Sequence, residues 1–120
     1  MPFRSMSQDE LRDQATVLDI LNAAHLAIEF LGGVDEGAFY DDPKTQSSVI
    51  HQILIIGEAV KRLSAAFREL HPGVPWQAMA GMRDQLIHAY HEVDLSEVWK
   101  TATFDLPVLV QQMERCQSEL

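Results

Sequence analysis

The residues best suited to chemistry lie in one short segment, residues 81–90. This segment holds an arginine, a carboxylate, an imidazole and a phenol: Arg83, Asp84, His88 and Tyr90. An arginine can bind a phosphate through two parallel hydrogen bonds, and a histidine that titrates near neutral pH can move the proton of a ribose 2′-hydroxyl. Because the 2′-oxygen is itself the nucleophile, such a pair could cleave RNA without a metal ion.

The spacing of these residues on a helix limits what they can do together. Asp84 and His88 are one turn apart on the same face, so the carboxylate can hold the imidazole and favour its charged form. Arg83 and His88 differ by roughly 140° around the axis, so they face one ligand only through the reach of the arginine side chain or across an interface between two subunits. On spacing alone the signal is weak, because an arginine and a histidine five residues apart occur by chance in many helices and ordinary surface ion pairing explains most of them.

Helices must position this segment, because apolar residues recur at helical spacing along the chain. Ser7 and Glu10 form a capping-box pattern that starts a helix at Gln8, and Gly32 with Gly33 ends it. A second helix begins at Asp42 and Pro43. Its apolar stripe comprises Val49, Ile53, Ile56, Val60, Leu63, Phe67 and Leu70.

Two further helices are predicted after the segment 71–75, which is rich in proline and glycine. The first spans residues 76–90, and Gly81 is the one position where a break in it could occur. The second opens at Leu95 behind the cap residue Asp94, and Pro107 should kink it. The sequence therefore predicts a single domain, residues 1–120, that is an all-α bundle of four to five up-and-down helices.

Composition restricts the class of protein. The chain has 120 residues and a formal net charge of −9, from 9 Lys and Arg against 18 Asp and Glu. That charge should repel nucleic acid, so any RNA site must be local. The single cysteine, Cys116, forms no intramolecular disulfide, and no apolar run is long enough to span a membrane. We therefore expect a cytoplasmic protein without membrane association.

Several blocks of the sequence, in order, resemble the HepT-like toxins, a branch of the HEPN ribonuclease superfamily. Arg83, His88 and Tyr90 reproduce the R-x-x-x-x-H-x-Y motif of that branch. The resemblance covers nearly the whole chain. The matching blocks are Ile55 to Ala59 with Lys61 to Leu63, His71 to Trp76, Gly81 to Asp84, Leu86 to Tyr90, Val93 to Leu95 with Val98 and Trp99, and Asp105 to Pro107.

The resemblance implies a HEPN-like helical homodimer in which two motifs meet in a cleft and cut RNA without a metal or cofactor. Arg83 and His88 would be its catalytic residues. The partner would be a minimal, MntA-like nucleotidyltransferase antitoxin that attaches AMP to Tyr90. A bulky negative group there would block the cleft and repel RNA.

Other residues have supporting or structural interpretations. Asp84 departs from the asparagine common at this position, and it partly cancels the charge of Arg83. Glu58 is a candidate to pair with Arg83 or Arg62 and orient the site, and Gly57 before it should allow close helix contact. His91 is an alternative titrating group. We interpret His25 and His51 as residues at the core edge or an interface, and Trp76 and Trp99 as packing anchors.

Three functional interpretations remain open from the sequence. The first is a metal-independent endoribonuclease toxin. The second is a non-catalytic helical partner or substrate-presenting subunit of a nucleotidyltransferase, in which Arg83 and His88 only hold a phosphate. The third is a structural helical oligomer, suggested by the long apolar stripes on the first two helices.

Overall fold

The fold is described by a computed structural model of residues 5–88 and 92–119. The described residues are helical, with no strand among them, which confirms the all-α prediction. The elements in chain order are α1 (Gln8–Leu31), α2 (Glu36–Tyr40), α3 (Pro43–Arg62), α4 (Ala65–Leu70), α5 (Trp76–His88), α6 (Leu95–Lys100), a π-helical turn η2 (Thr101–Asp105) and α7 (Leu106–Ser118).

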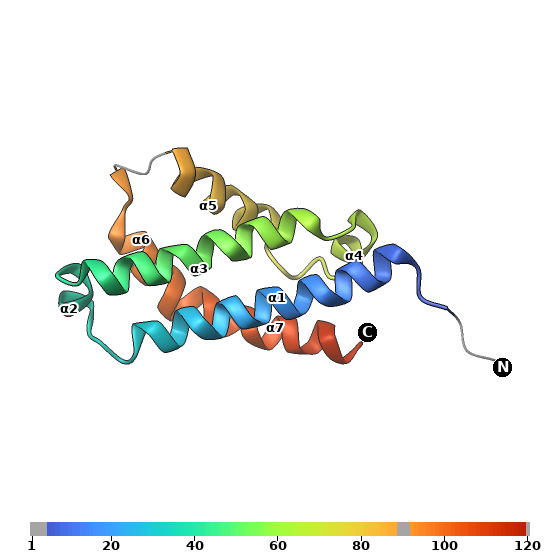
Figure 1. The fold of residues 1–120 in the computed structure, drawn as a ribbon, viewed down its shortest axis with the longest axis horizontal. Coiled ribbons are helices and arrows are strands. Elements are labelled where there is room, and N and C mark those ends of the chain that lie inside the picture. The colour runs from blue at the N-terminus through green and yellow to red at the C-terminus, as the bar shows by residue number, and fades with distance from the viewer. Residues whose placement is uncertain (1–4, 89–91, 120) are drawn as a thin grey trace.

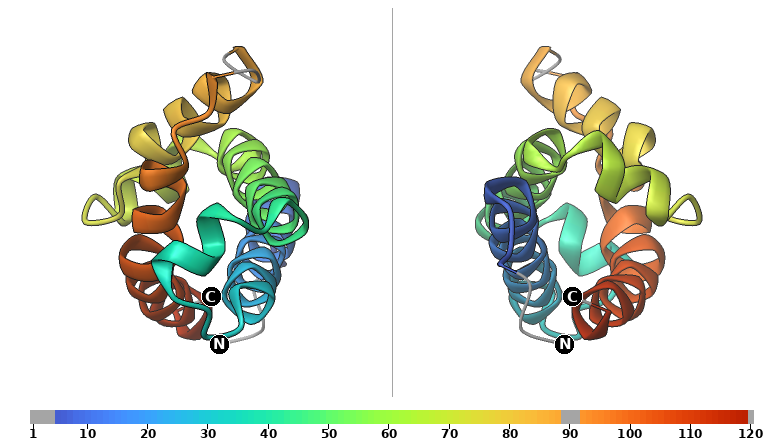
Figure 2. Two further views of the ribbon diagram at one scale, coloured as in Figure 1. Left: turned by 90° about the vertical axis from the view of Figure 1, so that its left-hand side faces the viewer. Right: turned by 90° about the vertical axis from the view of Figure 1, so that its right-hand side faces the viewer.

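Three long helices form the body of the molecule. α1 packs antiparallel against α3 on one side and contacts α7 on the other (Figure 1). α5 leans on α3 at the far side from α1, so that it projects from the bundle when the molecule is viewed end-on (Figure 2). The core lies where α1, α3 and α7 face one another, and α2 inserts the fully buried Phe39 into it.

The predicted helix starts are confirmed by their caps. Ser7 accepts a hydrogen bond from the Glu10 backbone N–H, and the Glu10 carboxylate accepts one from the Ser7 backbone N–H. The Asp42 carboxylate caps α3 by accepting a hydrogen bond from the Thr45 N–H, and the Asp94 carboxylate caps α6 by accepting from the Ser96 and Glu97 N–H groups. At the end of α1, Gly32 has a φ of 60°, the left-handed conformation that glycine adopts without steric cost.

The second predicted helix is wrong in its extent, because it breaks after Arg62. Leu63 is extended, and Ser64 caps the new helix α4 by accepting a hydrogen bond from the Phe67 N–H. The buried carboxylate of Asp13 on α1 fixes this break, since it accepts hydrogen bonds from the Ser64 N–H and hydroxyl at 2.8 and 2.6 Å. Leu70, expected in the buried stripe, is 75% exposed because α4 leaves the line of α3.

The last helix is disturbed just before Pro107, close to the predicted position. Pro107 has no N–H to offer the carbonyl of Thr103, and the chain forms the π-helical turn η2 there, with the Leu106 N–H bonded to the Thr101 carbonyl. α5 runs through Gly81 without interruption. In the described ranges, no helix is long and apolar enough to cross a membrane.

Candidate functional site

The candidate site lies where α5 crosses α3. Gly57 makes this contact possible, because a Cβ at that position would overlap the Arg83 Cβ and approach the Met79 carbonyl oxygen to 3.1 Å. The backbone of α3 therefore touches α5 at the level of Arg83. This confirms the close helix contact predicted for Gly57.

Arg83 lies in this contact, between two carboxylates. Its Nη2 is paired with Oε1 of Glu58 on α3, and its Nη1 donates a hydrogen bond to Oδ1 of Asp84 at 3.0 Å. The Asp84 hydrogen bond raises the pKa of Arg83 above its ordinary value, with a further contribution from Glu58 and some opposition from burial. Of the two partners predicted for Glu58, the structure shows Arg83.

Asp84 is shared between two cations. Besides Arg83, its Oδ1 accepts a hydrogen bond from Lys61 Nζ on α3 at 2.7 Å. These contacts hold the pKa of Asp84 below its usual range, first through Lys61 and then through Arg83, with burial opposing them. Glu58, Arg83, Asp84 and Lys61 thus form a network of alternating charge, which we call the α3–α5 charge network.

The other half of the sequence motif is only partly described. His88 is the last residue of α5, and its side chain lies outside the description. Tyr90 and His91 lie outside the described residues altogether. The predicted contact between Asp84 and His88 therefore stays a prediction.

The remaining residues singled out in the sequence lie apart from this network. His25 and His51 are exposed, and His25 Nε2 is 4.0 Å from Glu114 Oε1. Trp76 and Trp99 are packing residues, as predicted. The Trp76 indole N–H donates to the Arg68 and His71 carbonyls at 3.2 and 2.9 Å, and the Trp99 ring lies 5.4 Å from that of Phe39.

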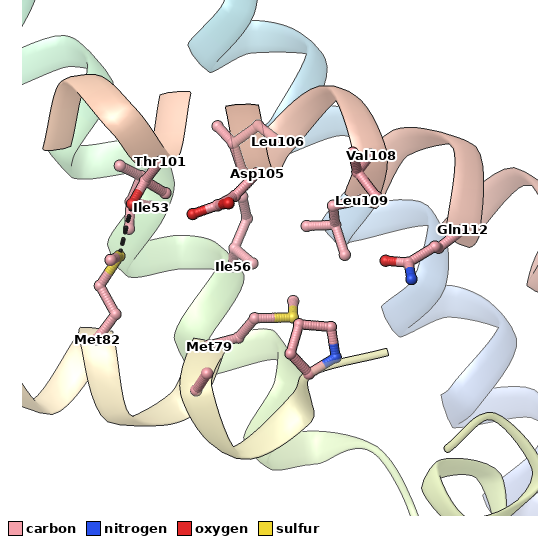
Figure 3. A pocket seen from close by; sticks show the side chains of 12 residues that line it. Ile53, Ile56, Met79, Met82, Thr101, Asp105, Leu106, Val108, Leu109 and Gln112 are labelled. Carbon is pink, nitrogen blue, oxygen red and sulfur yellow. Dashed lines mark hydrogen bonds between the residues drawn. The ribbon is translucent and has the colours of Figure 1, made fainter. Parts of the chain in front are cut away.

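An apolar pocket of about 230 Å³ lies on another side of α5, facing α7 and the π-helical turn (Figure 3). Met79 and Met82 point into it from α5, and Leu106, Leu109 and Gln112 line the opposite wall. As described, its lining includes no member of the α3–α5 charge network. The pocket and the charged groups are therefore separate features of the same helix.

The ion pair between Lys61 and Asp84 is the part of the site that sequence reasoning missed. In the sequence Lys61 stands out only as part of a matching block, because its partner Asp84 is 23 positions away. The available signal was its position three residues after Glu58, which places both side chains on adjoining parts of one helix face.

Comparisons with known proteins identify the family. The model of the family described as ribonuclease HepT-like matches residues 20–116. The chain belongs to the HepT-like ribonuclease family. The family match contains Glu58, Lys61, Arg83, Asp84 and His88, and hence the whole α3–α5 charge network.

Individual members of the HepT-like family are similar over most of their length. A Thermococcus cleftensis protein named "Probable ribonuclease HepT" is 45% identical over 81% of this chain and 88% of its own. Proteins named as candidate RNases in Methanocaldococcus jannaschii and Caldanaerobacter subterraneus are 36% and 40% identical, over 89% and 79% of this chain and 92% and 85% of theirs. No solved structure matches the chain.

Proposed function

We propose that this protein is a metal-independent endoribonuclease toxin of the cytoplasm. The observation that carries the proposal is the placement of Arg83, which two carboxylates hold at the edge of α5 inside the R-x-x-x-x-H motif of a HepT-like chain. Its side chain keeps 25% of its surface exposed, so a phosphate can reach it. Family membership then supplies the reaction class.

In the proposed reaction, Arg83 binds the scissile phosphate and stabilises the charge that develops on it. The ribose 2′-oxygen forms a bond to phosphorus, and the bond from phosphorus to the 5′-oxygen breaks. His88 takes the proton of the 2′-hydroxyl or gives one to the departing 5′-oxygen. The chain's own groups thus serve charge stabilisation and proton transfer, while the substrate supplies the nucleophile.

We further propose a homodimer with the two motifs facing one cleft. Arg83 and His88 are roughly 140° apart on α5, so a cleft between subunits lets an arginine of one chain and a histidine of the other act on the same phosphate. This arrangement also gives a physical reason for modification at Tyr90. An AMP group two residues from His88 would fill the cleft and repel the RNA backbone.

The partner that adds AMP would be a minimal nucleotidyltransferase antitoxin. The deciding experiment incubates purified, unmodified protein with total RNA in EDTA, beside the His88→Ala and Arg83→Ala variants. We expect cleavage by the wild type that both variants lose, with unchanged helicity. Cleavage retained by His88→Ala would contradict the assignment of His88.

Coexpression with the candidate nucleotidyltransferase tests the modification. The intact mass of the protein should rise by whole AMP units, and Tyr90→Phe should abolish the increase and restore growth arrest. Protein that is shown to be unmodified and yet cuts no RNA would instead favour the alternative, a non-catalytic subunit that presents a phosphate through Arg83 and His88.

A further inference from the structure

One carboxylate oxygen in the α3–α5 charge network is bound by two cations from two helices. Asp84 Oδ1 lies 2.7 Å from Lys61 Nζ and 3.0 Å from Arg83 Nη1. Arginine and lysine are also the side chains with which proteins bind phosphate. The Asp84 carboxylate therefore marks a position where an anion is stabilised.

The contacts of Asp84 can exchange with those of another anion. The side chains of Lys61 and Asp84 are 39% and 47% exposed, and an ion pair this exposed to water contributes little to stability. Displacing the carboxylate from Lys61 thus costs little, and the Arg83 guanidinium that it also leaves keeps its pair with Glu58. A phosphate that offers several oxygens could replace it.

Arg83 would stay in place after such an exchange. Its Nη2 is paired with Glu58, which belongs to α3 and does not depend on Asp84. Its Nε is buried and has no hydrogen-bond acceptor in the part of the chain that the structure describes, so the two carboxylates do not use this donor of the guanidinium. Glu58 can therefore keep the guanidinium beside Lys61 while Nη1 changes partner.

We propose that Lys61 and Arg83 together form a phosphate subsite for RNA, and that the Asp84 carboxylate occupies this subsite until RNA displaces it. The inference rests on the proposed ribonuclease function and names a second phosphate-binding residue for it. The chain has a net charge of −9, so RNA needs a local cationic site. Lys61 and Arg83 would supply such a site once the Asp84 carboxylate no longer neutralises them.

The chain offers a matched control next to Lys61. Arg62 points the other way around α3, and its Nη2 is 3.4 Å from Asp19 Oδ2 on α1. The pair of Arg62 and Asp19, like that of Lys61 and Asp84, joins a cation of α3 to an aspartate, and the side chains of the two pairs are similarly exposed. The pair of Arg62 and Asp19 lies away from Arg83. Changes at Arg62 and Asp19 thus report the effect of charge alone.

The experiment measures binding of a fluorescein-labelled, single-stranded 2′-O-methyl RNA, which cannot be cleaved because its nucleophile is blocked. Fluorescence anisotropy over a series of salt concentrations gives Kd and its salt dependence. Lys61→Gln should weaken binding about threefold to fivefold, the upper part of the range for one exposed ion pair. The plot of the logarithm of the association constant against log salt has a negative slope, and its magnitude should decrease by about 0.7, the value for one phosphate contact with a single strand. Lys61→Arg should bind as the wild type does.

The Asp84→Asn variant tests the displacement. It should bind more tightly than the wild type and more tightly than Asp19→Asn, and the gain should shrink when Lys61→Gln is also present. If Lys61→Gln and Arg62→Gln weaken binding equally, or if Asp84→Asn gains no more than Asp19→Asn, the proposal is overturned. Melting curves establish that each variant is folded.

Failure of this proposal can be separated from failure of the proposed function. The binding assay needs no turnover, whereas the ribonuclease assignment is tested by cleavage in the His88→Ala comparison. A wild type that cuts no RNA but shows the predicted binding differences would remove the enzyme and keep the subsite. Cleavage without these differences would do the reverse.

Discussion

The carboxylate of Glu58 on α3 is paired with the guanidinium of Arg83 on α5, across the point where the two helices touch at Gly57. The ion pair thus lies next to the closest backbone contact between the two helices. Because the Arg83 side chain is held from α3, its direction depends on α3 as much as on its own helix.

We expect Glu58→Gln to lower kcat for RNA cleavage by about tenfold or more, because a poorly directed guanidinium stabilises the reacting phosphate less well. KM should not rise, since the variant also loses a negative charge that repels RNA. The Glu58 side chain is 45% exposed, so the free energy of unfolding should change by less than about 1 kcal/mol. Steady-state kinetics and urea denaturation measure the two effects, with Glu114→Gln as the control. An unchanged kcat would show that Glu58 does not direct Arg83.

Gly57→Ala should destabilise the protein by about 1–3 kcal/mol, because the new methyl group overlaps the Arg83 side chain and forces α5 away from α3. Gly81 provides the control, since it lies in α5 and a Cβ there meets nothing within 4 Å. Gly81→Ala should be neutral or stabilising by up to about 1 kcal/mol, owing to the helix propensity of alanine. Equal effects of the two substitutions in urea denaturation would contradict the close contact.

The break between α3 and α4 should depend on a residue in α1. Asp13→Ala removes the acceptors of the hydrogen bonds from the Ser64 N–H and hydroxyl, and Asp13 is buried. We therefore expect the free energy of unfolding to fall by about 2–3 kcal/mol. Asp19→Ala removes an exposed carboxylate of the same helix and should cost no more than about 1 kcal/mol. A small effect at Asp13 would mean that Ser64 alone ends α3.

Acid should weaken the start of α3. The hydroxyl of Thr45 donates to Asp42 at 2.6 Å and, as the main cause, holds the pKa of Asp42 below its usual range. A carboxyl group with a lowered pKa in the folded state contributes stability above its unfolded pKa of about 3.9, and the contribution disappears as the pH falls through the folded value. Asparagine also caps helices but does not titrate there. The stability advantage of the wild type over Asp42→Asn should therefore shrink in acid.

Thermal unfolding from pH 7 to pH 2 measures this difference, and Asp41→Asn controls for the change in net charge. A wild-type advantage that stays constant across this range would contradict the role of Asp42 as a titrating cap.

The fold was predictable wherever the signal is local. The caps at Ser7, Asp42 and Asp94 each act within three residues, and the structure has each of them as the sequence predicts. The break at Ser64 was missed because the residue that fixes it, Asp13, is 51 positions away. No periodicity within the second helix carries that information, and the apolar stripe runs on through Phe67 as if the helix were continuous.

In the candidate site too, the residues in local motifs were predictable and the contact between distant residues was not. Arg83 and His88 could be selected from a motif, and Glu58 from a block next to Gly57. The ion pair between Lys61 and Asp84 depends on the exact register of α5 on α3, which a sequence does not specify without the contact at Gly57. The helical spacing predicts His88 as a partner of Asp84, which stays a prediction because the His88 side chain is not described, and the described partners of Asp84 are Lys61 and Arg83.

The π-helical turn Thr101–Asp105 affects which insertions and deletions the gene can tolerate. A π-helical turn accommodates one residue more than an α-helical turn, so the loss of one codon within it can leave an ordinary α-helix with the buried faces of α6 and α7 still aligned. The loss of one codon after Pro107 would instead rotate the rest of α7 by roughly 100° and turn Met113 and Cys116 out of the core. Length variation among descendants of this chain should therefore collect at the turn and avoid the helix that follows it.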